Sequence, residues 1–171
     1  MEEQLFVEKC SELQKNVAEN SKKTLQKILK EYFKENKDIL YIFWDQYTPY
    51  YMDGDECVFS VNDVMSVEML DLENFPRNKN TNELILPTLK EIAENKRYDS
   101  IDFDFIEDRL RTEMKEPITT EEYGRFFDIS CEKSLTKGFS AIEDIMRIIF
   151  GDHVDVFVDS NLNSLTMECK H

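Results

Sequence analysis

The stretch that decides the fold spans residues 39–47 and reads ILYIFWDQY. Its first six residues are aliphatic or aromatic without a polar break, which is typical of a strand and too continuous for a surface helix. Two further apolar runs follow at residues 57–61 and 64–69, and the Asp-Gly pair between the first two runs is a hairpin signal. We therefore expect three strands in this part of the chain.

The C-terminal segment predicts a second hairpin. Valine occupies every second position from 154 to 158, and Leu165, Met167 and Cys169 alternate with polar residues after a turn at residues 160–163. Such a period of two indicates strands with one buried face and one face in water.

Apolar residues at spacings of three and four predict a helix over residues 3–36. Asn20 and Ser21 interrupt this row, so we expect a kink or a second helix start there, with Ser21 as the N-cap. Because the stripe is broader than a coiled-coil seam, we expect the helix to pack on its own chain rather than on a second copy.

The remaining chain predicts shorter helices and one short strand. Residues 84–95 and 105–115 have helical patterns, and residues 101–105 alternate as a short strand would. Two possible capping boxes, at Thr119/Glu122 and Ser140/Glu143, open a helix that runs toward residue 132 and another that stops at Gly151. The fold class is therefore α+β: a single domain over residues 1–171, with one antiparallel sheet of about four to five strands and helices packed on one face.

Composition limits the classes of function. The net charge is −15, and the acidic excess lies in residues 39–171, since residues 1–38 carry eight acids and eight lysines. Direct binding of nucleic acid needs a basic face, so we expect none. No apolar run is long enough for a membrane span, and the N-terminus lacks the pattern of a secretory signal. We expect a cytoplasmic protein with four buried thiols, no membrane partner, and a monomeric or homodimeric state.

The densest group of carboxylates is Asp53-Gly54-Asp55-Glu56. Alternating carboxylates can bind a hard cation, but the spacing of an EF-hand fails because Val64 stands where the closing Glu belongs. A hairpin turn accounts for the Asp-Gly pair without any ligand.

A second acidic group follows the predicted helix at residues 84–95, and it consists of Asp99, Asp102, Asp104, Glu107 and Asp108. Paired carboxylates perform acid–base chemistry when burial separates their pKa values. The simpler interpretation is that Asp104 caps a helix with Glu107 in its first turn.

Nucleophilic catalysis has one candidate pair, Cys57 with His153, because both are expected near the ends of neighbouring strands. The simpler interpretation of Cys57 is a small apolar residue of the sheet. The sequence contains no zinc-binding spacing and no glycine-rich phosphate loop, so we assign no catalytic residue, no metal and no cofactor.

Aromatic residues gather after the first predicted strand, at Trp44, Tyr47, Tyr50 and Tyr51. Tyrosine and tryptophan supply large contact areas at low entropic cost and are enriched at binding hot spots. Together with Asp53 and Asp55, they are our candidate binding residues; the alternative is that most of these rings complete the core.

Residues 46–61, QYTPYYMDGDECVFSV, resemble a stretch in a family of small bacterial and phage proteins that have no established activity. In that family an aromatic-rich turn precedes Asn-Asp-Gly-Asp and a strand containing cysteine, and Met52 here replaces the Asn. Residues 150–154, FGDHV, which lead into the terminal hairpin, are also similar to that group. The resemblance implies an α+β fold and a bacterial or phage origin, and it implies no catalytic role.

These observations favour a non-enzymatic protein that binds a basic protein partner through the aromatic turn. A second hypothesis is a nucleic-acid mimic that blocks an enzyme acting on DNA or RNA. A third is a small metal-dependent or cysteine hydrolase centred on Asp53, Asp55, Cys57 and His153.

Overall fold

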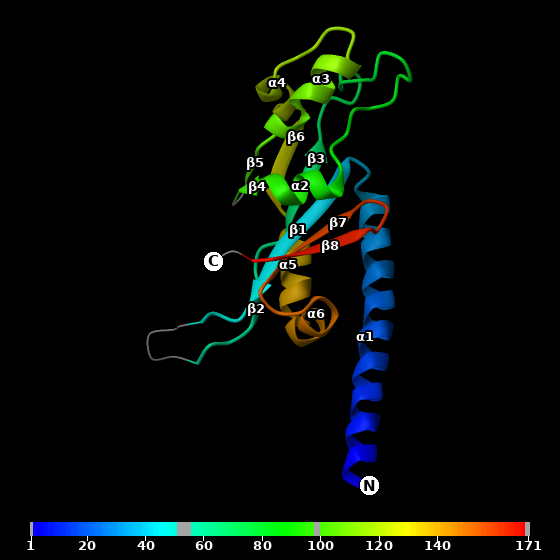
Figure 1. The fold of residues 1–171 in the computed structure, drawn as a ribbon, viewed down its shortest axis with the longest axis vertical. Helices are drawn as coiled ribbons and strands as arrows, with labels where there is room; N and C mark the ends of the chain where they lie inside the picture. The colour runs from blue at the N-terminus through cyan, green and yellow to red at the C-terminus, as the bar shows by residue number, and fades with distance from the viewer. Residues whose placement is uncertain (1, 51–55, 98–99, 170–171) are drawn as a thin grey trace.

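The fold is built around strand β1 (Ile39–Tyr47), which lies at the centre of an antiparallel sheet. The computed structural model describes residues 2–50, 56–97 and 100–169. The strand order is β6-β3-β1-β7-β8, and the short strand β2 (Ser60–Val61) pairs with the C-terminal end of β1. The other strands are β3 (Met65–Met69), β6 (Phe127–Cys131), β7 (Val154–Asp159) and β8 (Ser164–Glu168). The predicted α+β class and antiparallel sheet are thereby confirmed (Figure 1).

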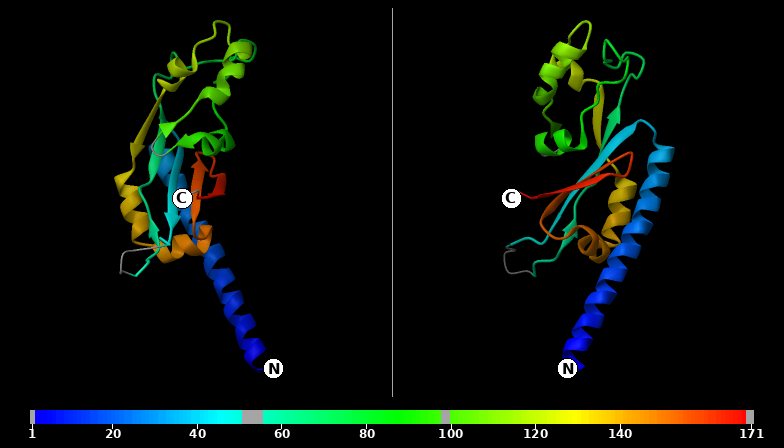
Figure 2. Two further views of the ribbon diagram at one scale, coloured as in Figure 1. Left: turned by 60° about the vertical axis from the view of Figure 1, so that its left-hand side comes forward. Right: turned by 45° about the vertical axis from the view of Figure 1, so that its right-hand side comes forward.

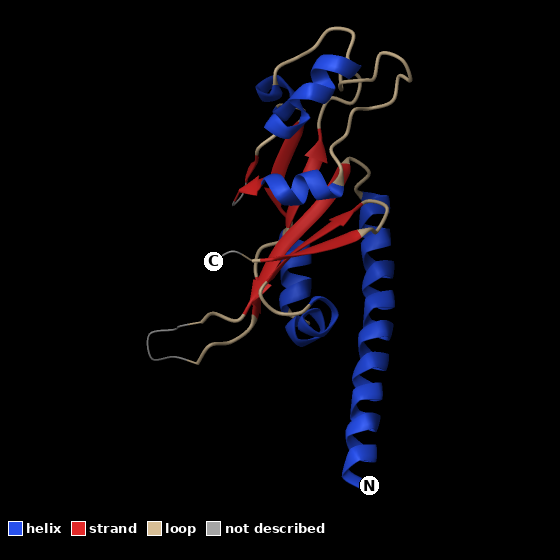
Figure 3. Cartoon of the chain, viewed as in Figure 1, coloured by secondary structure: helices blue, strands red, loops and turns tan. Residues whose placement is uncertain are grey.

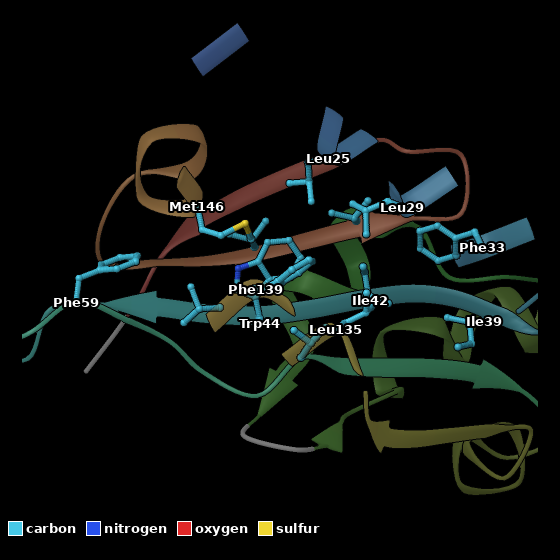
Figure 4. Close-up of a cluster of buried hydrophobic side chains, with 14 residues drawn as sticks. Leu25, Leu29, Phe33, Ile39, Ile42, Trp44, Phe59, Leu135, Phe139 and Met146 are labelled. Carbon is cyan, nitrogen blue, oxygen red and sulfur yellow. The ribbon is translucent and has the colours of Figure 1, made fainter. Parts of the chain in front are cut away.

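Helices cover both faces of this sheet, so the prediction of helices on one face is wrong. On one face Ile42 and Trp44 pack with α1 (Glu2–Glu35), α5 (Lys133–Ser140) and α6 (Glu143–Phe150) (Figure 4). On the other, Tyr41 and Phe43 pack with α2 (Leu89–Asn95), the 3-10 turn η1 (Asp104–Ile106), α3 (Glu107–Glu113) and α4 (Thr120–Gly124). The physical reason is the continuous apolar run of β1. A strand with apolar side chains on both faces must be covered on both faces, whereas an alternating strand is covered on one.

The terminal hairpin forms as predicted, but its first strand is buried on both sides. Val156, Phe157 and Val158 are all buried, since β7 pairs with β1 on one side and β8 on the other and lies between the two helical layers. Only β8 retains the predicted alternation of exposed and partly buried residues. The prediction of one wet face is therefore wrong for β7.

Helix α1 is unbroken through Asn20 and Ser21, so the predicted kink and N-cap do not occur. The helical propensities of Asn and Ser are only a few tenths of a kcal/mol below those of their neighbours, which is too little to end a helix. Packing on its own chain is confirmed only for the C-terminal half, where Leu25, Leu29 and Phe33 are buried. Residues 7–17 are all exposed, and this half projects from the body (Figure 2).

One capping box forms and the other does not. Thr119 Oγ1 accepts the N–H of Glu122 at 3.1 Å, but α4 ends at Gly124 and the chain continues as β6 rather than as helix to residue 132. Ser140 instead ends α5, and α6 begins without a side-chain cap. Helix α6 does stop at Gly151, whose φ of 94° suits glycine.

The region of residues 84–105 differs from its prediction in two places. Helix α2 begins only at Leu89, because Thr88 forms a capping box with Glu91. The alternating segment is not a strand beyond Ile101: strands β4 (Lys96–Arg97) and β5 (Ser100–Ile101) form a small separate sheet, and η1 follows at once (Figure 3).

The cysteines are not four buried thiols. Cys10 and Cys131 are exposed and Cys57 and Cys169 are partly buried, and all four are free. Cys10 lies on the projecting half of α1 and Cys131 ends the edge strand β6, positions at which the chain offers little cover. No helix in the described part of the chain is long and apolar enough to cross a membrane.

Candidate interaction site at the end of strand β1

Trp44 belongs to the core and not to a recognition surface, so this candidate binding residue was wrongly assigned. Its side chain is 1% exposed and its ring meets those of Phe139 and Phe150 edge to face, at centroid distances of 5.0 and 5.3 Å. The indole Nε1 donates a hydrogen bond to Gln46 Oε1 at 3.1 Å, which satisfies the one polar atom of the ring. Trp44 therefore anchors α5 and α6 on the sheet.

Gln46 connects the same strand to the end of α6. The side chain is fully buried, and its Nε2 donates to the carbonyl oxygens of Gly151 at 2.6 Å and Met146 at 3.2 Å. The carbonyl of Gly151 lies beyond the last bond of the helix, so a side-chain donor stabilises it there. The contact fixes the connection between α6 and β7 beside the last residues of β1.

Asp152 holds the chain where it leaves β1. Its carboxylate accepts the N–H and the hydroxyl of Thr48 at 2.8 and 2.6 Å, and the N–H of His153 at 2.9 Å. It also forms an ion pair with Arg147 at 2.9 Å. Burial opposes its charge, but the hydrogen bonds and the guanidinium outweigh burial and hold the pKa of this carboxyl below its ordinary value.

Arg147 and Glu143 secure the other end of the segment between β1 and β2. The guanidinium of Arg147 lies over the ring of Phe59, 5.4 Å from its centroid, while a carboxylate oxygen of Glu143 accepts the N–H of Val61 at 3.1 Å. Residues 48 and 59 are thus both attached to α6 and its C-terminal connection. The described residues beside these anchors, 48–50 and 56–59, lead away from the body (Figure 1).

Tyr50 is the most exposed large hydrophobic side chain of the described residues, at 83%. Its ring stacks on His153 with a centroid distance of 4.5 Å and an interplanar angle of 10°. The partly buried ring of Tyr47 lies on the same histidine, at 6.5 Å. We call these three rings, Tyr47, Tyr50 and His153, the aromatic platform.

The backbone of His153 is in the left-handed region, with a φ of 57°, where residues other than glycine are uncommon. The hydrogen bond of its N–H to Asp152 and that of its carbonyl to the N–H of Cys169 hold this conformation. The sequence suggests a role for His153 only as a partner of Cys57. The pairing of Gln46 with Val154 is what brings it to the tyrosines, and no local pattern reveals that register.

The other predicted binding residues, Tyr51, Asp53 and Asp55, lie outside the described residues. The structure therefore brings together Tyr47 and Tyr50, adds His153 to them, and removes Trp44 from the surface set.

The acidic group near residue 104 is engaged in ordinary surface contacts. Asp102 lies 3.5 Å from Arg97, Asp104 accepts the hydroxyl of Thr120 at 2.9 Å, and Glu107 pairs with Arg111. Asp104 is the first residue of η1 and not a helix cap, whereas Asp99 lies outside the described residues. Across residues 2–50, 56–97 and 100–169, no three His, Cys, Asp or Glu side chains are placed to hold a metal ion.

The thiols and hollows of the described chain do not form a second candidate centre. Burial, with the nearby charge of Asp155, raises the pKa of Cys169 to about 12, so this thiol stays protonated at neutral pH. The ring of His153 is engaged with Tyr50. A hollow of about 750 Å³ lies between α1 and Ile148, and another of about 500 Å³ is lined by Phe103 and Phe127 with Asp102, Asp104 and Glu121 at its sides.

Comparison of the chain with protein-family models, with curated proteins and with solved structures finds no match.

Proposed function

We propose that this is a non-enzymatic interaction protein that binds a protein partner through the aromatic platform. The observation that carries the proposal is the 83% exposed ring of Tyr50, held flat against His153 by a backbone that is itself fixed by Asp152. A ring that is exposed but already ordered loses little conformational entropy on binding, which is the property of an interface anchor.

The charge of the molecule indicates the kind of partner. A net charge of −15 attracts a basic surface and increases the rate of encounter. The charge of Asp152 is already paired with Arg147, so the attraction comes from the acidic surface as a whole rather than from the platform. We therefore expect the tyrosines to provide affinity and the acidic residues to provide speed and selectivity.

The first experiment is an affinity pull-down from host lysate, washed at low and at high salt, with identification by mass spectrometry. Binding of the recovered partner is then measured for wild type, Tyr50→Ala and the matched control Val58→Ala, which truncates another exposed apolar residue of the same segment. Loss of a hot-spot side chain lowers affinity by about 30-fold. Equal affinities for the two variants would remove the platform from the interface.

The same recovered partner tests the nucleic-acid mimic. A mimic presents carboxylates in place of phosphates, so its binding must fall steeply with salt and DNA must compete with it. Retention of the partner at high salt, with sensitivity to Tyr50→Ala, supports the aromatic platform instead.

The hydrolase hypothesis is tested by thermal unfolding with Mg²⁺, Mn²⁺, Ca²⁺ and Zn²⁺, because a ligand that binds only the native state raises its stability. A rise in melting temperature that Asp53→Asn or Asp55→Asn removes would support a metal site at these residues.

A further inference from the structure

A second surface of the molecule lies on the N-terminal half of α1. Every residue from 7 to 17 is exposed, and all three views show this half extending beyond the sheet and the other helices (Figures 1 and 2). It is separate from the aromatic platform, which lies where β1 ends and β7 begins.

Three large apolar side chains are exposed along one side of α1. Leu13 is 64% exposed, Val17 is 40% exposed and Ile28 is 48% exposed. Spacings of four and eleven residues place all three on one side of a helix with 3.6 residues per turn. This row is turned away from the row formed by Leu25, Leu29 and Phe33, which packs on the body.

The projecting half gains little from tertiary packing, because residues 7–17 are all exposed. Most of its residues are good helix formers, but a helix of about this length is marginal in water when propensity alone supports it. Packing of an apolar row against a neighbour is the usual source of helix stability, so a surface that covers Leu13 and Val17 would stabilise this half of α1.

The charges of α1 identify the neighbour. Residues 2–19 contain five glutamates and two lysines, whereas residues 20–35 contain five lysines and two glutamates. The two halves thus carry net charges of −3 and +3. The helix dipole favours acidic residues in the first turn and basic residues in the last turn only. It therefore does not account for Glu12, Glu19, Lys22 and Lys23, which lie well inside the helix.

We propose that the exposed row of α1 pairs with the same row of a second copy, in the antiparallel direction. Leu13 of each copy then lies opposite Ile28 of the other, and Val17 lies opposite Thr24. The same antiparallel arrangement also pairs the charges: the acidic half of each helix runs along the basic half of its partner, and Lys9 lies near Glu31. Asn20 and Ser21 meet at the centre, where polar side chains fix the register of a helix pair.

The first test is the molar mass of the intact chain, measured by light scattering over a wide range of concentration. Wild type is expected to approach twice the 20.3 kDa of the monomer. The double variant Leu13→Glu/Val17→Glu should remain monomeric with unchanged circular dichroism. The control Gln26→Glu adds a charge at an exposed position about 180° round the helix from Val17 and should still dimerise. A monomeric wild type, or a dimeric double variant, would overturn the proposal.

The second test fixes the direction of pairing, with the exposed Cys10 and Cys131 replaced by serine. Antiparallel pairing predicts that Val17→Cys/Thr24→Cys forms a disulfide-linked dimer under mild oxidation and that Val17→Cys alone does not. The two positions lie about 10 Å apart along one helix, beyond the reach of a disulfide, so neither a bond within one helix nor a 17–17 bond can form. Efficient cross-linking of Val17→Cys alone would show parallel pairing and contradict the proposed geometry.

Discussion

Two parts of this molecule project from its body, and they are held in different ways. The described residues of the segment after β1, 48–50 and 56–59, form no helix or strand, but Asp152, Arg147 and Glu143 attach them to the chain at both ends. The N-terminal half of α1 is regular helix, but residues 7–17 are all exposed. Regular structure and tertiary support therefore do not coincide here.

The difference indicates two kinds of surface. At the aromatic platform the chain itself orders the ring of Tyr50, so a partner meets a surface that is already formed. On α1 the apolar row of Leu13 and Val17 lacks cover from its own chain, so the partner must supply the packing. The following predictions test whether each surface has the support that this comparison assigns to it.

The largest effect is expected for Trp44, which resembles Tyr50 in sequence context but not in burial. Trp44→Ala removes a fully buried ring and should lower the free energy of unfolding by about 4 kcal/mol. Tyr50→Ala should change it by less than about 0.5 kcal/mol. Urea unfolding of both variants measures the two values, and a large loss in Tyr50→Ala would mean that the platform is part of the core.

The next effect compares two leucines of α1. Leu29→Ala should lower the free energy of unfolding by about 3 kcal/mol, because Leu29 is 3% exposed and packs on the sheet. Leu13→Ala should leave it within about 0.5 kcal/mol at concentrations where the chain is monomeric. Urea unfolding at low protein concentration measures both free energies. Similar losses for both leucines would mean that the N-terminal half also packs on the body.

Asp152 should have a smaller effect that depends on pH. Asp152→Asn weakens its hydrogen bonds with Thr48 and its pairing with Arg147, and should cost about 1–2 kcal/mol at pH 7. The folded-state pKa of Asp152 is lowered, so its contribution is fully present above its ordinary value of 3.8 and is lost as pH falls through the folded value.

Unfolding of wild type and Asp152→Asn from pH 7 down to pH 2 should therefore show two stabilities that converge at the acid end. A difference that stayed constant over this range would show that the charge of Asp152 does not support the end of β1.

Much of the sheet could be predicted because its signals are local. The continuous run of β1 and the alternation of residues 154–158 each identify a strand without reference to any other part of the chain. Gly151 likewise marks the end of α6 through its own backbone requirement. These local patterns together predicted the α+β class correctly, but they could not place helices on both faces.

The errors occur where tertiary contacts decide between similar local patterns. Residues 127–131 form β6 because they pair with β3, with Ser66 opposite Ser130 and Val67 opposite Ile129. No short-range sequence pattern indicates this pairing. Ser140 and Glu143 have the sequence spacing of a capping box, but the carboxylate of Glu143 instead accepts the N–H of Val61.

The residues of the candidate site also depended on tertiary contacts that the sequence does not reveal. Trp44 and Tyr50 lie in one aromatic stretch, and only the sheet determines that one ring is buried and the other exposed. The contribution of His153 depends on the pairing of Gln46 with Val154, a contact between positions far apart in the chain.

The smallest effect on stability, and the sharpest test of the platform, is expected for His153→Gly. Glycine adopts a φ of 57° without steric cost, so the change should relieve about 1 kcal/mol of backbone strain. It also removes the ring that stacks on Tyr50, a contact worth about 1 kcal/mol. The two terms oppose each other, so the free energy of unfolding should change by less than about 0.5 kcal/mol.

Partner binding should nevertheless fall nearly as far as in Tyr50→Ala, because the exposed ring loses the surface that orders it. Unfolding and binding measured on the same preparation separate the two effects. Retained binding in His153→Gly would mean that the strained histidine serves the fold and not the platform.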